Sequence, residues 1–283
     1  MAGARIRTLT DGDIERAIAL TDLEGWGYTR ADFARLLALH PGGCFAAEEG
    51  GKVVGMLSTT VYGRLAFLGA VIVDPSRRGG GIGDAMMRAA LDHLDGLGVE
   101  TVRLNAYLHV VPFYERLGFR KEYENVRWQG PPPQTKASVA RPVAASDLSR
   151  LIEFDARFFG ASRARLLELL RQEFGRTFLV RERDGDLFGF VVGNTSSADC
   201  EVGPWIVHPT HRDGARDLFD GLVSAAGGRS YALTAPVVNH ASGDFMRELG
   251  YREVFRTLRM VRGRTAFDGA PRGVWALAGL EKG

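Results

Sequence analysis

The sequence matches itself when it is shifted by 134 residues, and this internal repeat restricts the possible fold more than any other feature. Arg7 aligns with Arg141, and each precedes a segment whose apolar residues recur at helical spacing. Further along, Val71–Pro75 aligns with Trp205–Pro209 at the same offset. Chance similarity would not keep this order over half a chain, so we expect two copies of one structural unit.

Each copy predicts the same succession of elements. A helix is followed by two strands joined at a turn, Glu49–Gly51 in the first copy and Asp184–Gly185 in the second, which is hairpin chemistry. A strand, a helix, a strand and a helix follow. This alternation predicts an α/β fold in which each copy is a mixed central β-sheet flanked by helices.

The boundary between the copies is marked by composition. Pro131–Pro133 favours an extended spacer, so we predict a first domain over residues 1–130, a Pro-rich linker over 131–138 and a second domain over 139–283. The tail from about Arg262 lies beyond the repeat, and Val274–Leu277 within it reads as one more strand.

Charge and composition exclude several classes of function. Lys and Arg total 36 against 34 acidic residues, so the net charge of +2 argues against nucleic acid or membrane partners. No run approaches the roughly 18 apolar residues of a membrane span, and we expect a soluble, cytoplasmic protein. Cys44 and Cys200 stand in no CxxC spacing and read as core residues, without a disulfide or a metal site.

The most informative segment is a strand, glycine loop and helix start in the first copy. An apolar strand ends at Asp74-Pro75, glycines fill positions 79–81 and 83, and a helix with Met87 and Leu91 on one face follows. Unpaired backbone N–H groups and the positive end of a helix dipole converge at such a turn, which favours an anionic ligand. The spacing is neither a Walker motif nor Gly-x-Gly-x-x-Gly.

With Arg78, Gly81 and Gly83 the loop fits Arg/Gln-x-x-Gly-x-Gly/Ala, and here the chain resembles the GNAT superfamily of acyl-CoA N-acyltransferases. A second signature agrees, because Asn105 at a strand end is followed nine residues later by Tyr114. Within the superfamily the chain resembles bacterial two-domain members with a divergent C-terminal GNAT-like domain.

The resemblance implies a role for each matching residue. The amides of the loop would hold the coenzyme A diphosphate, the strand before it would pair with the pantetheine arm, and the phenol of Tyr114 would protonate the leaving thiolate. Asn105 would contact the pantetheine or the following helix. The candidate cofactor residues are Val71, Ile72, Val73, Arg78, Gly79, Gly80, Gly81, Ile82, Gly83, Asp84, Asn105 and Tyr114.

A base for the acceptor amine is harder to place. Many members of the family carry a Glu on the strand leading into the glycine loop, whereas Phe67–Val73 contains no acid. Glu24, in a loop that borders the acceptor site in this family, is our candidate, and His109 or a chain of waters is an alternative. For both side chains an ordinary surface role is the competing interpretation. Trp26 reads as a lid or core aromatic.

The second copy has lost the signatures. At the repeat offset Gly81 becomes Ala215 and Gly83 becomes Asp217, and at the later offset of 132 residues Tyr114 becomes Met246. We therefore expect this copy neither to bind coenzyme A nor to catalyse. Phe154, Phe158 and Phe159 either wall the acceptor cleft or belong to the core.

The sequence as a whole predicts an enzyme that moves the acetyl group of acetyl-CoA directly to a primary amine of a small molecule, with its active site in the N-terminal domain. An acyl-enzyme is not expected, because Cys44 begins a strand and no His or cationic partner for its thiol is apparent from the sequence. The alternatives are a non-catalytic acyl-CoA sensor and an enzyme that modifies protein lysines. The sequence does not identify the acceptor or the oligomeric state.

Overall fold

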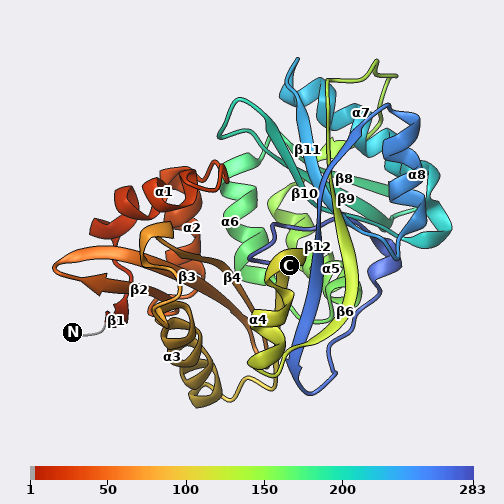
Figure 1. Cartoon of the computed structure of the whole chain (residues 1–283). Coiled ribbons are helices and arrows are strands. Elements are labelled where there is room, and N and C mark those ends of the chain that lie inside the picture. The colour runs from red at the N-terminus through yellow and green to blue at the C-terminus, as the bar shows by residue number, and fades with distance from the viewer. Residues whose placement is uncertain (1–3) are drawn as a thin grey trace. The chain divides into compact units, whose positions relative to one another are not determined.

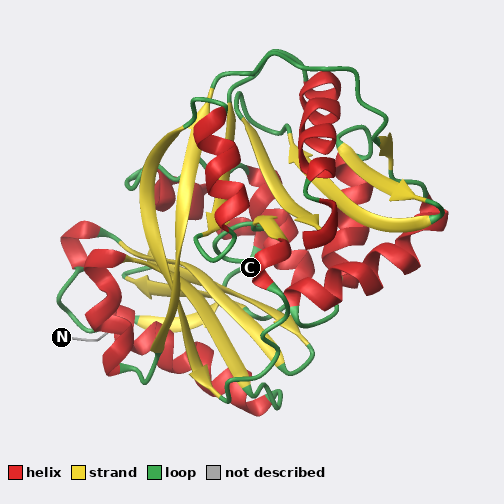
Figure 2. Ribbon diagram, turned by 90° about the vertical axis from the view of Figure 1, so that its right-hand side faces the viewer, coloured by secondary structure: helices red, strands yellow, loops and turns green. Residues whose placement is uncertain are grey.

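The computed structural model describes residues 4–283, which divide into two compact units (Figures 1 and 2). The first unit comprises residues up to Leu104 together with Lys282, and the second comprises Asn105–Glu281 together with Gly283. Figure 2 shows yellow strands lined by red helices in both parts of the chain, so the predicted α/β class is confirmed.

The first unit is a sheet with helices that follow its strands in sequence. Its strands lie in the order β1 (Arg5–Thr8), β2 (Cys44–Glu49), β3 (Lys52–Tyr62), β4 (Leu65–Val73), β5 (Thr101–Tyr107), and only β4 and β5 are parallel. Its helices are α1 (Ile14–Asp22), α2 (Arg30–Leu39) and α3 (Ile82–Gly96). Ile14, Ala17 and Leu20 recur at helical spacing and are fully buried, which places α1 over the core shared with α2.

The second unit repeats this plan. Its strands lie in the order β12 (Arg252–Gly263), β6 (Arg120–Gly130), β11 (Tyr231–Pro236), β10 (Cys200–Val207), β9 (Asp186–Asn194), β8 (Phe178–Arg183), β7 (Arg141–Pro142), and β13 (Val274–Ala276) pairs with β10. Its helices are α4 (Val111–Arg116), α5 (Leu148–Phe159), α6 (Ala164–Phe174), α7 (Asp213–Ala226) and α8 (His240–Glu248). Trp205, stacked on Phe219 at 5.5 Å, lies in the core, as do Phe154, Phe158 and Phe159.

One polar network occurs in both copies and shows that the repeat is structural. Arg7 pairs with Asp13 and with Glu48 at 2.8 Å each, joining the start of the first helix to strand β2. Arg141 pairs with Asp147 at 2.6 Å and with Glu182 at 2.7 Å, and these three residues stand 134 positions later. The two copies therefore share the same local structure at equivalent positions.

The compact units do not coincide with the domains expected from the sequence. We expected the first domain to extend to residue 130, whereas the units divide after Leu104. The reason is strand β6, which pairs with β12 on one side and with β11 on the other. Residues 131–138 contain no helix or strand, and Ser138 Oγ donates to the carbonyl of Asp217 at 2.8 Å.

β6 and β12 occupy equivalent places in the two copies and lie antiparallel, with Arg120 opposite Val261 and Gln129 opposite Arg252. Each is thus the neighbour of its own counterpart. This pairing joins the last strand of the first copy to the strands of the second. No local sequence signal predicts it.

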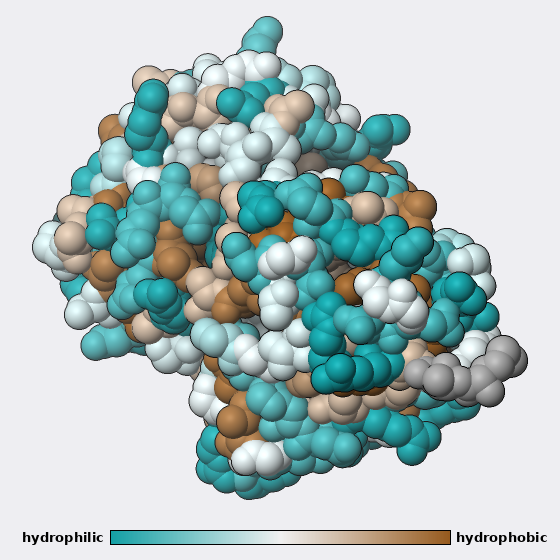
Figure 3. Space-filling model, turned by 90° about the vertical axis from the view of Figure 1, so that its left-hand side faces the viewer, coloured by the Kyte–Doolittle hydropathy of each residue, from teal (hydrophilic) through white to brown (hydrophobic). Residues whose placement is uncertain are grey.

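Two further expectations concern the surface and the cysteines. No helix among residues 4–283 is long and apolar enough to span a membrane. On the face drawn in Figure 3, hydrophilic residues are interspersed with smaller hydrophobic areas. Cys44 and Cys200 are both free and buried, as predicted for core residues, and burial raises the pKa of each thiol to about 12.

Candidate active site

The glycine loop leaves a row of backbone amides accessible at the start of α3. Gly79 and Gly81 adopt φ of 82° and 79°, a left-handed conformation that side chains rarely accept. Ala85 N–H donates to the carbonyl of Gly81 at 3.0 Å, so the amides of Ile82–Asp84 precede the first hydrogen bond of the helix. Residues 78–81 are exposed. Such an arrangement suits an anion, because the donors and the helix dipole point to one place.

Arg78 holds the beginning of this loop. Its Nε donates to the carbonyl of Val73 at 3.0 Å, and its Nη2 pairs with the carboxylate of Glu24. Both side chains are partly exposed, at 50% and 37%. The structure therefore brings Glu24 to the glycine loop, where its negative charge is matched by a guanidinium. This contact favours a role for Glu24 in positioning the loop rather than in taking a proton from an amine.

Strand β4 parts from β5 just before the loop. The two strands pair only between Leu65–Phe67 and residues 101–103, and further along β4 Ile72 and Val73 pair with β3. Between these stretches Ala70 has a φ of 50°, a conformation uncommon for a residue with a side chain, and the register against β3 shifts nearby. The bulge leaves Val71–Val73 without a partner strand on the side of β5, a free edge on which the Val73 carbonyl accepts from Arg78. No local pattern of residues predicts the unusual conformation at Ala70.

Asn105 is engaged by other parts of the second unit. Its Nδ2 donates to the carbonyl of Leu280 at 2.7 Å, and its Oδ1 accepts from Asn125 Nδ2 at 2.9 Å. The tail of the chain thus contacts the residue that we expected at the pantetheine. The orientation of the Asn105 amide is fixed by these two partners.

Tyr114 lies on the short helix α4 and is 8% exposed. Its ring packs edge-on against Phe113 at 5.1 Å and Phe119 at 6.0 Å. Burial raises the pKa of the phenol, so it stays protonated at neutral pH and has a proton to give.

His109 and Trp26, the other residues considered from the sequence, pack against neighbouring aromatic side chains. His109 is exposed and stacks on Tyr107 at 6.0 Å, and Trp26 packs against the core of the first unit beside Tyr28. Neither has an environment that marks it as a base. The prediction of Trp26 as a lid or core aromatic is resolved in favour of the core.

In the second copy the equivalent turn is helical. Arg212 has φ of −58° and α7 begins at Asp213, whereas in the first copy the helix begins only after the glycines. Asp217, which replaces Gly83, pairs with Arg181 at 2.6 Å and accepts from Val139 N–H at 3.1 Å. Met246, which replaces Tyr114, is fully buried. The second copy therefore lacks both the open amides and the phenol.

Comparison with known families accounts for both halves. The model of the acetyltransferase (GNAT) family matches residues 15–119, and that of an acetyltransferase (GNAT) domain matches residues 151–276. The chain belongs to the GNAT superfamily. It carries two GNAT domains in tandem, as the repeat predicted, and it is an N-acyltransferase of the GNAT type, a class that uses an acyl-CoA as donor.

Several individual proteins resemble the chain over most of its length. Holothin acyltransferase from Pseudoalteromonas sp. (strain SANK 73390) is 26% identical over 92% of this chain and 88% of its own. A Pyrococcus horikoshii protein assigned as an acetyltransferase has the same fold, with a TM-score of 0.84 at 23% identity over 100% of this chain and 97% of its own. The tandem GNAT protein of the clavulanic acid biosynthesis pathway has a TM-score of 0.63 at 18% identity, over 92% and 98% of the two chains.

Proposed function

We propose that this GNAT enzyme transfers the acetyl group of acetyl-CoA to a primary amine of a small molecule, and that the N-terminal copy is the active one. The observation that carries the proposal is the difference between the two turns. The first copy opens its amides with left-handed glycines at positions 79 and 81, whereas the second copy closes the same turn into a helix. Only the first can receive a diphosphate through backbone N–H groups.

The residues of the first copy fit the parts of the donor. The amides of Gly79–Asp84 would hold the diphosphate, and the free edge of Val71–Val73 would pair with the amides of the pantetheine arm as an added strand does. The Asn105 amide would lie beside that arm. Acetyl-CoA supplies an activated thioester carbonyl, and these residues of the protein would position it.

The chemistry is a direct transfer. The neutral amine attacks the thioester carbonyl, a C–N bond forms and the C–S bond breaks, and the amine proton leaves to water or a base. The departing sulfur takes the proton of Tyr114, which burial keeps on the phenol. A covalent acyl-cysteine is disfavoured, because both thiols are buried and have a pKa of about 12.

Two observations bear on the acceptor and its deprotonation. The name of the holothin acyltransferase gives a small molecule as its acceptor, and that relative aligns over 88% of its own length, which supports a small-molecule acceptor here. A lysine-like amine requires about 4 kcal/mol to be presented neutral at pH 7. Because Glu24 is paired with Arg78, we assign this step to water rather than to that carboxylate.

The test is thiol release from acetyl-CoA over a panel of amino sugars, aminothiols, aromatic amines and lysine peptides. Turnover with a small amine, and none with peptides, supports the proposal. Turnover with lysine peptides alone would overturn the acceptor class. Calorimetric binding of acetyl-CoA without turnover on any amine would favour an acyl-CoA sensor.

A further inference from the structure

The second copy retains a splayed pair of strands. β10 and β11 pair in parallel only between Cys200–Val202 and Tyr231–Leu233. Beyond that point they separate, as β4 and β5 do after Phe67. A gap between parallel strands exposes backbone groups on both edges, and these groups must find partners when they are buried.

The tail of the chain supplies those partners. β13 pairs antiparallel with β10, Ala276 opposite Trp205 and Val274 opposite Ile206. On the other side, Leu277 N–H donates to the carbonyl of Thr234 in β11 at 2.9 Å. A single short segment therefore bridges the two separated strands.

Polar contacts from the start of α8 and the residue before it hold the tail in place. Asn239 Nδ2 donates to the carbonyl of Val274 at 2.9 Å, and Ser242 Oγ donates to the carbonyl of Trp275 at 2.9 Å. The Trp275 side chain is 4% exposed and lies 5.2 Å from the ring of Trp205. The tail is thus bound by its backbone and by one large buried side chain, as a peptide ligand is.

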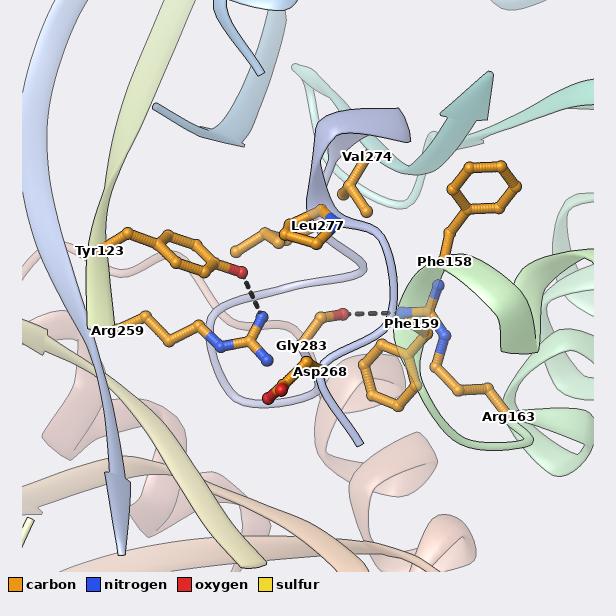
Figure 4. Close-up of a pocket in the computed structure, with 10 residues that line it drawn as sticks. Tyr123, Phe158, Phe159, Arg163, Arg259, Asp268, Val274, Leu277 and Gly283 are labelled. Atoms are coloured by element: carbon orange, nitrogen blue, oxygen red, sulfur yellow. Dashed lines mark hydrogen bonds between the residues drawn. The ribbon is translucent and has the colours of Figure 1, made fainter. Parts of the chain in front are cut away.

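The slot is shaped for a close backbone. A Cβ added to Gly203 would lie 1.8 Å from the carbonyl oxygen of Leu277, so no side chain fits there. Further along, Figure 4 shows Gly283 facing Arg163, whose Nη1 donates to the Gly283 carbonyl at 2.8 Å. The cavity beside them measures about 10 Å³, roughly one water, so little space is left.

The tail pairs with residues of β10 whose equivalents in the first copy form the free edge of β4. Trp205 and Ile206 are the repeat equivalents of Val71 and Ile72, the residues whose free edge we assigned to the pantetheine arm. β13 therefore occupies in the second copy the edge that stands open in the first.

We propose that the β10–β11 slot is a strand-binding site whose ligand is the chain's own segment Val274–Leu277, standing where an acyl-CoA arm would pair. The second copy is then a GNAT domain in which a segment of the same chain occupies the gap between β10 and β11. The comparison with the acyl-CoA arm rests on the proposed function, whereas occupancy of the slot by the tail rests on the contacts above.

The test separates the tail from the domain after folding. A protease site is inserted between Arg264 and Thr265, in an exposed segment without helix or strand, and the folded protein is cut. We expect native mass spectrometry to show fragment 265–283 still bound, with slow hydrogen exchange at Trp205–Val207. An excess of labelled peptide 265–283 should replace it, and the same peptide with Trp275→Ala should bind at least about a hundredfold more weakly.

Two results would overturn the proposal. One is release of the fragment with unchanged exchange at Trp205–Val207, and the other is equal binding of both peptides. A second variant covers a failure of the insertion to fold: Trp275→Ala in the full chain should speed exchange at Trp205–Val207 and leave the β4 segment Leu65–Phe67 unchanged, and no change at either place also overturns the proposal. None of these readouts uses acyl-CoA, so absent turnover would overturn the proposed function alone.

Discussion

The guanidinium of Arg78 forms an ion pair with the carboxylate of Glu24, 54 positions earlier in the sequence. Because the same guanidinium also donates to the carbonyl of Val73, the start of the glycine loop is tied both to the end of β4 and to the loop that follows α1. The carboxylate that we considered as a base is thereby an ion-pair partner of the glycine loop.

Glu24→Gln separates these two roles. Loss of a partly exposed ion pair costs about 0.2–1 kcal/mol, so we expect KM for acetyl-CoA to rise a few-fold, by less in high salt, with kcat within about threefold of wild type. Steady-state kinetics at two salt concentrations measures this. A fall of kcat by a hundredfold or more, with KM unchanged, would instead make Glu24 the base.

Tyr114→Phe tests the proton donor. Removal of a general acid slows the chemical step by about 10²–10⁴-fold, so kcat should fall by at least a hundredfold while the Kd of acetyl-CoA stays within a few-fold. The matched control is Tyr251→Phe, because Tyr251 is also a buried tyrosine and its hydroxyl lacks a hydrogen bond within the described residues. Thiol release and calorimetry measure both variants. If the control loses as much activity, the effect is one of packing.

Burial also predicts the pH profile of this group. Because the pKa of Tyr114 is raised, its phenol stays protonated as pH increases, and ionisation of the phenol should cause no loss of kcat up to about pH 10. A rate profile from pH 7 to 10 with a small saturating amine measures this. A basic limb that falls with a midpoint below 9, and is absent in Tyr114→Phe, would contradict the buried environment.

Gly83→Asp tests the anion site by copying the second domain. An acidic residue in the first turn of a helix is favourable for folding, but its charge and bulk oppose a diphosphate at the same amides. We expect the Kd of acetyl-CoA to rise by at least about a hundredfold, since charged hydrogen bonds of 1.5–3 kcal/mol are lost. The control is Gly96→Asp at the other end of α3, where a Cβ meets nothing within 4 Å. Tight calorimetric binding to Gly83→Asp would refute our account of the loop.

The sequence predicted what depends on local chemistry and on repetition. The two α/β copies, the glycine turn before α3 and the added strand at Val274 all follow from residue patterns. Contacts between segments far apart in the sequence have no local residue pattern that predicts them. Nothing in the sequence indicates that the carboxylate of Glu24 pairs with Arg78 rather than with another cation. Likewise, no residue pattern in β6 predicts that it pairs with β11 and β12. The domain limit expected at residue 130 differs from the compact units for that reason.

A histidine pair in the first unit predicts a pH dependence of stability. His40 Nδ1 contacts Thr59 Oγ1 at 2.8 Å and His40 Nε2 lies 3.4 Å from Nε2 of His93, whose ring also faces Phe45. Burial and then the charge of His93 lower the pKa of His40. The unfolded chain therefore binds the proton more tightly than the folded one, and stability falls as pH drops below about 6.5.

Urea unfolding at pH 7.5 and 5.5 measures this dependence. We expect a lower midpoint at pH 5.5 in the wild type and a smaller drop in His40→Gln. The exposed His109→Gln should behave like the wild type. An equal drop in all three proteins would assign the effect to other groups.

The repeated Arg–Asp–Glu network offers the same substitution in two degrees of burial. Asp13 and Asp147 each accept from an arginine and from a backbone N–H, but the Asp147 side chain is 4% exposed against 13% for Asp13, and Arg150 adds a further ion pair at 3.0 Å. We expect Asp147→Asn to cost about 2–4 kcal/mol of unfolding free energy and Asp13→Asn about 1–2 kcal/mol, because the carboxylate lost at position 147 is more buried and has two arginine partners.

Acid should reduce the difference in stability between these variants and the wild type. The guanidinium of Arg7 holds the pKa of Asp13 well below its usual range, and that of Arg141 does the same for Asp147. The stabilisation is therefore complete above about pH 5 and is lost as pH falls toward the folded-state pKa. Denaturant titrations at pH 7 and pH 3 measure both effects. Equal costs at pH 7 would show that burial does not set the strength of the two copies, and an undiminished cost at pH 3 would show that charge does not.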